Sequence, residues 1–412
     1  MNSVAHIQVE RISVANSPLH IAVVTETYPP DINGVAHTLS KMVQGLRDKG
    51  HVIWLIRPRQ EKTDEAVEGQ RYQEVLVKGL PIPFYKQLRM GLPAKGDLVR
   101  LWTKQRPDIV HIATEGPLGW SALQAAKKLK LPISTDFRTN FHAYSQHYGI
   151  GWLSGTVMAY LKKFHNTAQS TMVPTAELRE ELHQSGFKRL SVVPRGVDTR
   201  FFSPEHRSDA LRASWGVGSE DRVLLYVGRL AAEKNLHLIF QTYRRLLAQH
   251  PDLKLVLVGD GPLRSQLQSQ HPEAIFAGFQ TGAALAAHYA SADVFMFASQ
   301  TETFGNVTLE AMASGLAVAA FDHAAAGQLI QSGVNGMLAP ALSDLDFELA
   351  VHTLLNSRDL MRSIAHNAHQ TAQQLSWQQI VEKTETIFHH ILAAHLNTQQ
   401  TTLTMVAPHV AL

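Results

Sequence analysis

The sequence alternates short, continuously apolar runs with longer segments whose apolar residues recur at helical spacing. The run His20–Pro30 (HIAVVTETYPP) ends in a loop, and the segment Val35–His51 has the apolar spacing of an amphipathic helix. Further apolar runs follow at Val52–Ile56, Asp108–Ile112 and Pro132–Thr135. Continuous apolar strands separated by helices are typical of a parallel sheet that is covered on both faces. We therefore expect a doubly wound α/β fold.

The alternation stops between Val192 and Arg222, where proline, glycine and polar residues are typical of a linker. A second set of apolar runs follows, each with a helical segment behind it: RVLLYVGR, LKLVLVGDGP, AIFAGF, DVFMFAS and LAVAAF. At 412 residues the chain has the length of two domains. We predict α/β domains at 19–200 and 201–376, a C-terminal helix at 377–396, and flexible tails at 1–18 and 397–412.

The composition, 45% hydrophobic and 18% charged, is that of a soluble globular protein. There is no cysteine, which excludes disulfides and thiolate metal sites and fits a reducing compartment. The segment Met1–His20 lacks the apolar core of a signal peptide, and no run of about 18 apolar residues occurs. The expectation is a cytoplasmic protein without a membrane-spanning helix.

The charge is unevenly distributed along the chain. Residues 1–200 hold 26 Lys and Arg against 17 Asp and Glu, whereas residues 201–412 hold 12 against 18. Two basic segments, Pro83–Trp102 and Met158–His165, also carry aromatic and aliphatic residues. Such segments can rest on an anionic membrane surface, or they can be ordinary amphipathic surface elements. No nucleic-acid-binding pattern is present, so nucleic acid is not an expected partner.

The stretch ETFGNVTLE places two carboxylates, Glu302 and Glu310, on either side of a predicted helix start at Asn306. A helix N-terminus offers unpaired backbone N–H groups and the positive end of a dipole, so it attracts phosphate. The two carboxylates can accept hydrogen bonds from hydroxyl groups at both ends of one ligand. This combination suits a sugar joined through phosphates to a nucleoside, although both residues could also be ordinary carboxylates at a helix start.

Glycines and cations stand at other strand-to-helix turns. Gly34 lies where the first loop enters a helix, and such a glycine lets backbone amides approach a phosphate. Arg229 and Lys234 follow a predicted strand, at the sheet edge where open α/β sheets bind ligands. The turn VGDGP lacks the last glycine of the dinucleotide fingerprint, since Arg264 stands there, and no P-loop occurs.

Taken together, the motifs resemble the retaining nucleotide-sugar glycosyltransferases of family 4, and in particular their α-mannosyltransferase and glycolipid synthase subgroup. The resemblance covers about residues 20–395 and rests on NGVA at Asn33, PRGVD at Pro194, VGRLAAEKN at Val227, VGDGP at Val258, SADVFMFAS at Ser291 and the Glu302/Glu310 pair. It implies the GT-B fold, in which two Rossmann-like domains face each other across a cleft.

The resemblance also implies roles for the matching residues. Arg229 and Lys234 would neutralise the departing diphosphate, and Glu302 would bind hydroxyls of the donor sugar. The remaining residues would contact the donor: Gly34 its phosphate or sugar, Glu310 its ribose, and the helix start its sugar and phosphate through Phe304, Gly305, Asn306 and Val307. Because Arg and Lys can stabilise the leaving group, no metal or other cofactor is expected.

The segment STDFRTNFHAYSQHYGIGWL resembles the acceptor side of the subgroup but departs from it at one position. Many members have His where this chain has Arg138. An arginine cannot act as a base, yet it can bind phosphate or an anionic sugar. Arg138 is therefore predicted to replace the histidine electrostatically, or His142 takes over. His142 can equally be a polar residue on a helix.

The expected activity is transfer of a hexose from GDP-mannose or a UDP-hexose to a hydroxyl of a lipid or glycan, with retention of configuration. The Arg138 departure leaves open a nucleotide-sugar-binding protein that has lost transfer activity. An epimerase or a phosphorylase on the same scaffold is a further alternative, because a fold does not fix a function.

Overall fold

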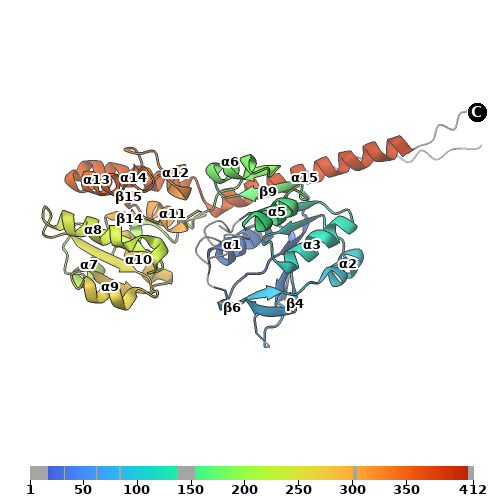
Figure 1. Cartoon of the computed structure of the whole chain (residues 1–412), viewed down its shortest axis with the longest axis horizontal. Coiled ribbons are helices and arrows are strands. Elements are labelled where there is room, and N and C mark those ends of the chain that lie inside the picture. The colour runs from blue at the N-terminus through green and yellow to red at the C-terminus, as the bar shows by residue number, and fades with distance from the viewer. Residues whose placement is uncertain are drawn as a thin grey trace, which may run out of the picture.

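The structure, a computed structural model, describes residues 17–31, 33–61, 63–82, 85–137, 154–299 and 304–406. Two parallel sheets, each with its own set of helices, lie side by side along the long axis of the molecule (Figure 1). The predicted α/β fold with two parallel-sheet domains is confirmed.

The N-terminal sheet has the strand order β10-β9-β8-β7-β1-β2-β4-β3, and its pairs are parallel except for β3 with β4. Its strands are β1 (His20–Val24), β2 (Val52–Pro58), β3 (Glu68–Gly69), β4 (Tyr72–Val77), β7 (Ile109–Ile112), β8 (Ile133–Asp136), β9 (Ser170–Val173) and β10 (Leu190–Val192). A separate hairpin joins β5 (Gly79–Ile82) to β6 (Tyr85–Gly91).

Helices cover both faces of this sheet, which explains why β1 is apolar at every interior position. Ile21 and Val23 pack against α1 (Gly34–Asp48), whereas Ala22 and Val24 pack against the opposite layer. That layer contains α2 (Lys95–Lys104), α3 (Pro117–Lys128) and α5 (Ser154–His165). Another helix of the domain, α6 (Ala176–Gln184), connects β9 to β10.

The C-terminal sheet has the order β13-β12-β11-β14-β15-β16, and all its pairs are parallel. Its strands are β11 (Val223–Val227), β12 (Lys254–Val258), β13 (Ile275–Gly278), β14 (Val294–Phe297), β15 (Ala317–Phe321) and β16 (Met337–Ala339). The helices around it are α7 (Asp209–Ser214), α8 (Leu236–Leu247), α9 (Arg264–Gln270), α10 (Gly282–Ser291), α11 (Asn306–Ala313), α12 (Ala324–Leu329), α13 (Asp344–Asn356) and α14 (Arg358–Gln373).

The chain passes between the two domains twice, and the two crossings lie together. Val197 forms a parallel bridge with Ser376, and its amide donates a hydrogen bond to the Leu375 carbonyl at 3.0 Å. A Cβ on Gly196 would lie 2.9 Å from the Cα of Trp377, so only glycine allows this approach. The predicted linker between Val192 and Arg222 thus contains the first crossing and, beyond it, the short helices η3 (Pro204–His206) and α7.

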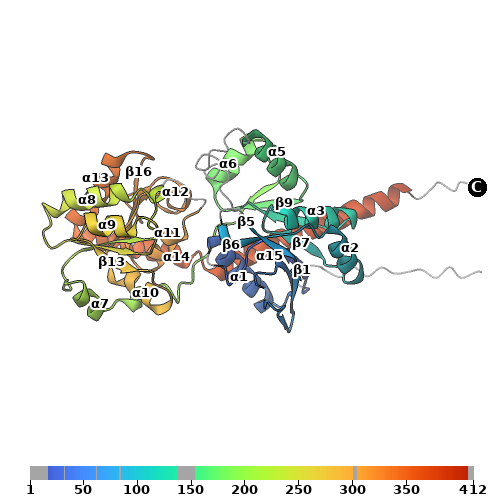
Figure 2. The same ribbon diagram turned by 60° about the horizontal axis from the view of Figure 1, so that its bottom comes forward.

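The last helix, α15 (Trp377–Val406), returns to the N-terminal domain (Figures 1 and 2). Val381 and Phe388 join the core that α1 and β1 form. The helix extends past the predicted boundary at residue 396 because no glycine or proline interrupts Trp377–Val406. Although this helix follows the C-terminal domain in the sequence, it therefore belongs to the core of the N-terminal domain.

Candidate active site

The site is built around the first turn of α11, which begins at Asn306 as predicted. Gly305 precedes it with φ +88°, a conformation that favours glycine, and as the N-cap residue it has no side chain to cap the helix. Backbone amides at the positive end of a helix dipole can bind an anion. Val307 is half-buried beside them. Phe304 is 1% exposed, and its side chain packs in the core of the C-terminal domain, where it anchors the turn.

Glu310 lies one turn into α11, and its carboxylate is held by a buried tyrosine. The Tyr289 hydroxyl donates to Oε2 of Glu310 at 2.9 Å. Burial raises the pKa of the Glu310 carboxyl to about 7, and the Tyr289 hydrogen bond opposes this rise. A second carboxylate oxygen remains to accept hydrogen bonds from a ligand hydroxyl, as the prediction for the donor ribose requires.

The predicted cations follow the carboxyl end of β11, in the middle of the C-terminal sheet. Arg229 is exposed, and its Nη1 lies 3.9 Å from Oε1 of Glu233. Lys234 is half-buried at the end of the short helix η4 (Ala232–Lys234). Since β11 pairs with β14, and β14 leads toward α11, both cations belong to the same sheet edge as the α11 start.

The N-terminal domain contributes the start of α1 to the same place. Asn33 caps this helix, its Oδ1 accepting from the amides of Val35 at 3.1 Å and Ala36 at 2.9 Å. Gly34 is exposed, and a Cβ on it would lie 3.9 Å from Nδ2 of Asn306. The structure therefore brings together two residues that the sequence separates by most of the chain.

Arg195 completes this junction and was not among the predicted site residues. Its side chain is buried, with the residue 6% exposed, and its Nη1 donates to Oδ1 of Asn306 at 3.3 Å. The guanidinium carbon lies 5.8 Å from the centre of the Phe304 ring. The same Nη1 would lie 3.1 Å from a Cβ on Gly34. The sequence feature that could have pointed to Arg195 is its position as a lone cation between Pro194 and Gly196, in the predicted linker.

A further carboxylate, Glu26, fixes the loop that follows β1 in the N-terminal domain. Its Oε1 accepts from the amide of Leu118 at 2.9 Å, and Oε2 accepts from the amide of Gly91. Burial raises the pKa of this carboxyl, while the backbone hydrogen bonds oppose the rise. Glu26 therefore joins three elements of the N-terminal domain: the β1 loop, β6 and α3.

Three predicted site residues, Glu302, Arg138 and His142, lie outside the described residues. Among the residues that are described, no group of three or more His, Asp and Glu side chains is placed to hold a metal ion. No helix in the described ranges is long and apolar enough to cross a membrane. The roles of Gly34, Arg229, Lys234, Phe304, Gly305, Asn306, Val307 and Glu310 in donor binding remain predictions.

Comparison with known proteins identifies the family to which the chain belongs. The family model "Glycosyltransferase Family 4" matches residues 32–201, and "Glycosyl transferases group 1" matches residues 207–371. A GDP-mannose-dependent alpha-mannosyltransferase of Corynebacterium glutamicum is 32% identical over 332 residues, which are 80% of this chain and 78% of that protein. The chain belongs to the family 4 glycosyltransferases. Its mannosyltransferase relatives make it a hexosyltransferase.

Other relatives of this glycosyltransferase include lipid-modifying enzymes. An alpha-monoglucosyldiacylglycerol synthase of Streptococcus pneumoniae is 27% identical over 79% of this chain and 76% of that protein. Among solved structures, sucrose-phosphate synthase from Thermosynechococcus elongatus has a TM-score of 0.73 at 18% identity, covering 91% of this chain and 99% of the other. Anabaena HepE in complex with UDP has a TM-score of 0.72 at 19% identity, with 90% and 100% covered. These likenesses confirm the expected GT-B fold.

Proposed function

We propose that this glycosyltransferase moves a hexose from GDP-mannose or a UDP-hexose to a hydroxyl of a lipid or glycan, with retention of configuration and without a metal ion. The observation that supports it is the junction between the domains. There Arg195, in the first domain crossing, contacts Asn306 at the start of α11 and lies next to Gly34 at the start of α1. Two helix N-termini and a buried guanidinium make this a favourable place for a pyrophosphate.

In the proposed reaction the bond between the anomeric carbon and the β-phosphate oxygen breaks as the acceptor oxygen bonds to that carbon from the same face. The acceptor hydroxyl gives its proton to the departing phosphate. Charge on the leaving group grows in the transition state, and Arg229, Lys234 and the start of α11 stabilise it there. Glu302 holds hydroxyls of the donor sugar, and Glu310 holds the ribose. Arg138 binds anionic groups on the acceptor side.

The test is incubation with GDP-mannose, UDP-glucose and UDP-galactose, with and without a lipid extract, and with EDTA present in parallel. We expect a glycosylated product whose anomeric configuration by NMR matches that of the donor and whose yield EDTA does not change. An inverted product or an EDTA-sensitive rate contradicts the corresponding part of the proposal. Glu302→Ala should lower turnover more than nucleotide affinity, whereas Glu310→Ala should mainly weaken nucleotide binding, by roughly 1.5–3 kcal/mol.

We further propose that the N-terminal domain rests on an anionic membrane surface at the cytoplasmic face. A groove of about 550 Å³ between α2, α3 and α5 supports this, since three lysines and a tryptophan are among its lining residues: Pro93, Lys95, Trp120, Ser121, Gln124, Lys127 and Lys163. Nζ of Lys163 lies 5.8 Å from the centre of the Trp120 ring. Cosedimentation with phosphatidylglycerol vesicles should fall for a variant with the three lysines changed to glutamate, and equal binding of both proteins contradicts the proposal.

A further inference from the structure

The C-terminal domain carries a basic pocket at the sheet edge opposite the candidate active site. Arg222 directly precedes β11 and Asp293 directly precedes β14, so the pocket lies at the amino ends of the strands whose carboxyl ends lead to Arg229 and α11. The strands separate the two places by roughly 15 Å, at about 3.3 Å per residue. The pocket has a volume of about 340 Å³, and four arginines line it: Arg207, Arg222, Arg358 and Arg362.

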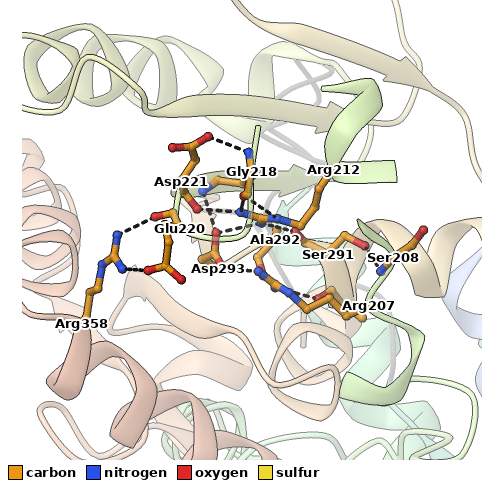
Figure 3. A network of polar contacts seen from close by, with 12 residues as sticks. Arg207, Ser208, Arg212, Gly218, Glu220, Asp221, Ser291, Ala292, Asp293 and Arg358 are labelled. Atoms are coloured by element: carbon orange, nitrogen blue, oxygen red, sulfur yellow. Dashed lines mark hydrogen bonds and ion pairs between the residues drawn. The ribbon is translucent and has the colours of Figure 1, made fainter. Parts of the chain in front are cut away.

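The carboxylates of this pocket are already engaged by other groups (Figure 3). Asp293 accepts from Arg207 at 3.1 Å and from the buried Arg212 at 3.2 Å. Asp221 accepts from the amide of Gly218 at 2.7 Å. Glu220 pairs with Arg358, which also donates to the Glu220 carbonyl at 2.6 Å. These contacts fix the walls of the pocket, and among the described residues two of the lining arginines pair with no carboxylate.

The first of these is Arg222, which is half-buried. Its Nη1 donates to Nδ1 of His250 at 3.3 Å, and because arginine only donates, the imidazole must be unprotonated at that atom. Nε of Arg222 is buried and has no hydrogen-bond partner among the residues that the structure describes. Burial and the nearby Arg358 charge lower the pKa of the Arg222 guanidinium. A buried donor that lacks an acceptor is costly. The Arg222 side chain also lines the pocket, so an anion there would meet its positive charge.

The second is Arg362, which is exposed one turn after Arg358 on α14. Within the part of the chain that the structure describes, its guanidinium makes no hydrogen bond or ion pair. A guanidinium matches the oxygens of a phosphate through two parallel hydrogen bonds. Arg222, directly before β11, and Arg362, on α14, therefore present positive charge from two different segments to one ligand between them.

We propose that this pocket binds the phosphate group of a small anion, either inorganic phosphate or a phosphate monoester. Four arginines against three carboxylates leave the lining net positive. The volume is at the lower end of the range for small-molecule sites, so the pocket has room for more than a bare phosphate. A ligand here would connect α14 to Arg222, the residue before β11. α14 also contacts α11, since His369 Nδ1 donates to the Ala313 carbonyl at 2.7 Å. The ligand would therefore stabilise the helix that packs against α11.

The test is calorimetric titration of the full chain with inorganic phosphate and with glucose 6-phosphate, each at constant ionic strength. Arg362→Gln is the main variant because the exposed side chain can be changed without disturbing the fold. We expect saturable binding by the wild type and a Kd raised roughly ten- to a hundredfold in Arg362→Gln. Arg362→Lys should recover part of the affinity, since it restores the charge without the paired donors. Arg245→Gln, on α8, is the matched control and should bind like the wild type.

The proposed donor site could also bind phosphate, so the double variant Arg229→Ala/Lys234→Ala separates the two sites. We expect it to bind phosphate with the wild-type Kd. The proposal is overturned if no saturable binding occurs, if Arg362→Gln binds as tightly as the wild type, or if binding disappears in the Arg229/Lys234 variant. Preference for glucose 6-phosphate over inorganic phosphate, lost in Arg362→Gln, would identify the ligand as a phosphate monoester.

Discussion

Nη1 of Arg195 donates a hydrogen bond to Oδ1 of Asn306 at 3.3 Å, which joins the first crossing between the domains to the first turn of α11. The same guanidinium nitrogen faces Gly34 at the start of α1. The Arg195 charge also acts on His37. Burial is the main cause that lowers the pKa of His37, and the charges of Lys41 and Arg195 lower it further. Arg195 thus places a fixed positive charge between two helix N-termini.

Arg195→Ala should lower kcat/KM for the nucleotide sugar roughly ten- to a hundredfold, because a charged hydrogen bond contributes about 1.5–3 kcal/mol. Arg195→Lys should recover part of this, since it keeps the charge but not the planar fork. Initial-rate kinetics and nucleotide titration provide the measurement. Arg200→Ala, which removes an exposed arginine from the same segment, serves as the control. Similar kinetics for both alanine variants would show that Arg195 plays no part in donor binding.

Gly34→Ala should impair donor binding without unfolding the protein. The added Cβ would lie 3.1 Å from Nη1 of Arg195, tighter than ordinary contact, and would extend into the proposed donor site. We expect the donor KM to rise at least tenfold while the melting temperature stays within a few degrees. Gly155→Ala, at the second residue of α5 with nothing within 4 Å, is the matched control and should be active. Unchanged donor KM in Gly34→Ala contradicts the assignment.

The Glu310 carboxyl should make stability depend on pH. Its folded-state pKa of about 7 lies above the ordinary 4.5, so the folded protein keeps a proton that the unfolded chain has released. Stability is then lost as pH rises between these two values. Glu310→Gln removes this cost, and its gain over the wild type should grow from pH 5 to pH 8, up to about 3 kcal/mol.

Thermal melts of both proteins across this pH range give the comparison. A constant difference between them from pH 5 to pH 8 would mean that Glu310 does not titrate there. Nucleotide titrations in the same buffers should show wild-type affinity rising with pH, since the ionised carboxylate accepts at both oxygens, whereas one oxygen of the protonated group carries an O–H that donates. The affinity of Glu310→Gln should not follow pH in this way.

Gly45→Ala should destabilise the contact between α1 and α15. Its Cβ would clash with Cγ2 of Val381, and overpacking of this kind costs about 1–3 kcal/mol. Replacing a glycine in a helix by alanine otherwise stabilises, so the sign of the effect is diagnostic. Gly96→Ala, on α2 with open space around it, should not lower the melting temperature. Adding Val381→Ala to Gly45→Ala should restore part of the loss, and no restoration would place the clash elsewhere.

Several features of the site could be predicted from local sequence. The start of α11 at Asn306 followed from a glycine in front of an apolar, alanine-rich segment, and the strands followed from continuous apolar runs such as Val223–Val227. These signals are local, because backbone conformation and burial on both faces leave a direct pattern in neighbouring residues. The hydrogen bond from the Tyr289 hydroxyl to Glu310 left no such pattern, because α10 and α11 meet only when the fold packs them on the same face of the sheet.

The sequence by itself determined the alternating α/β architecture, the two parallel-sheet domains and the family, because strand apolarity and motif order are properties of the chain. Only the tertiary structure decided that α15 packs against the first domain, that Arg195 meets Asn306 and Gly34, and that Arg222 and Arg362 line one pocket. The physical reason is that these contacts join residues far apart in the chain. Their partners are selected by how the sheets and helices pack, and no local periodicity records that choice.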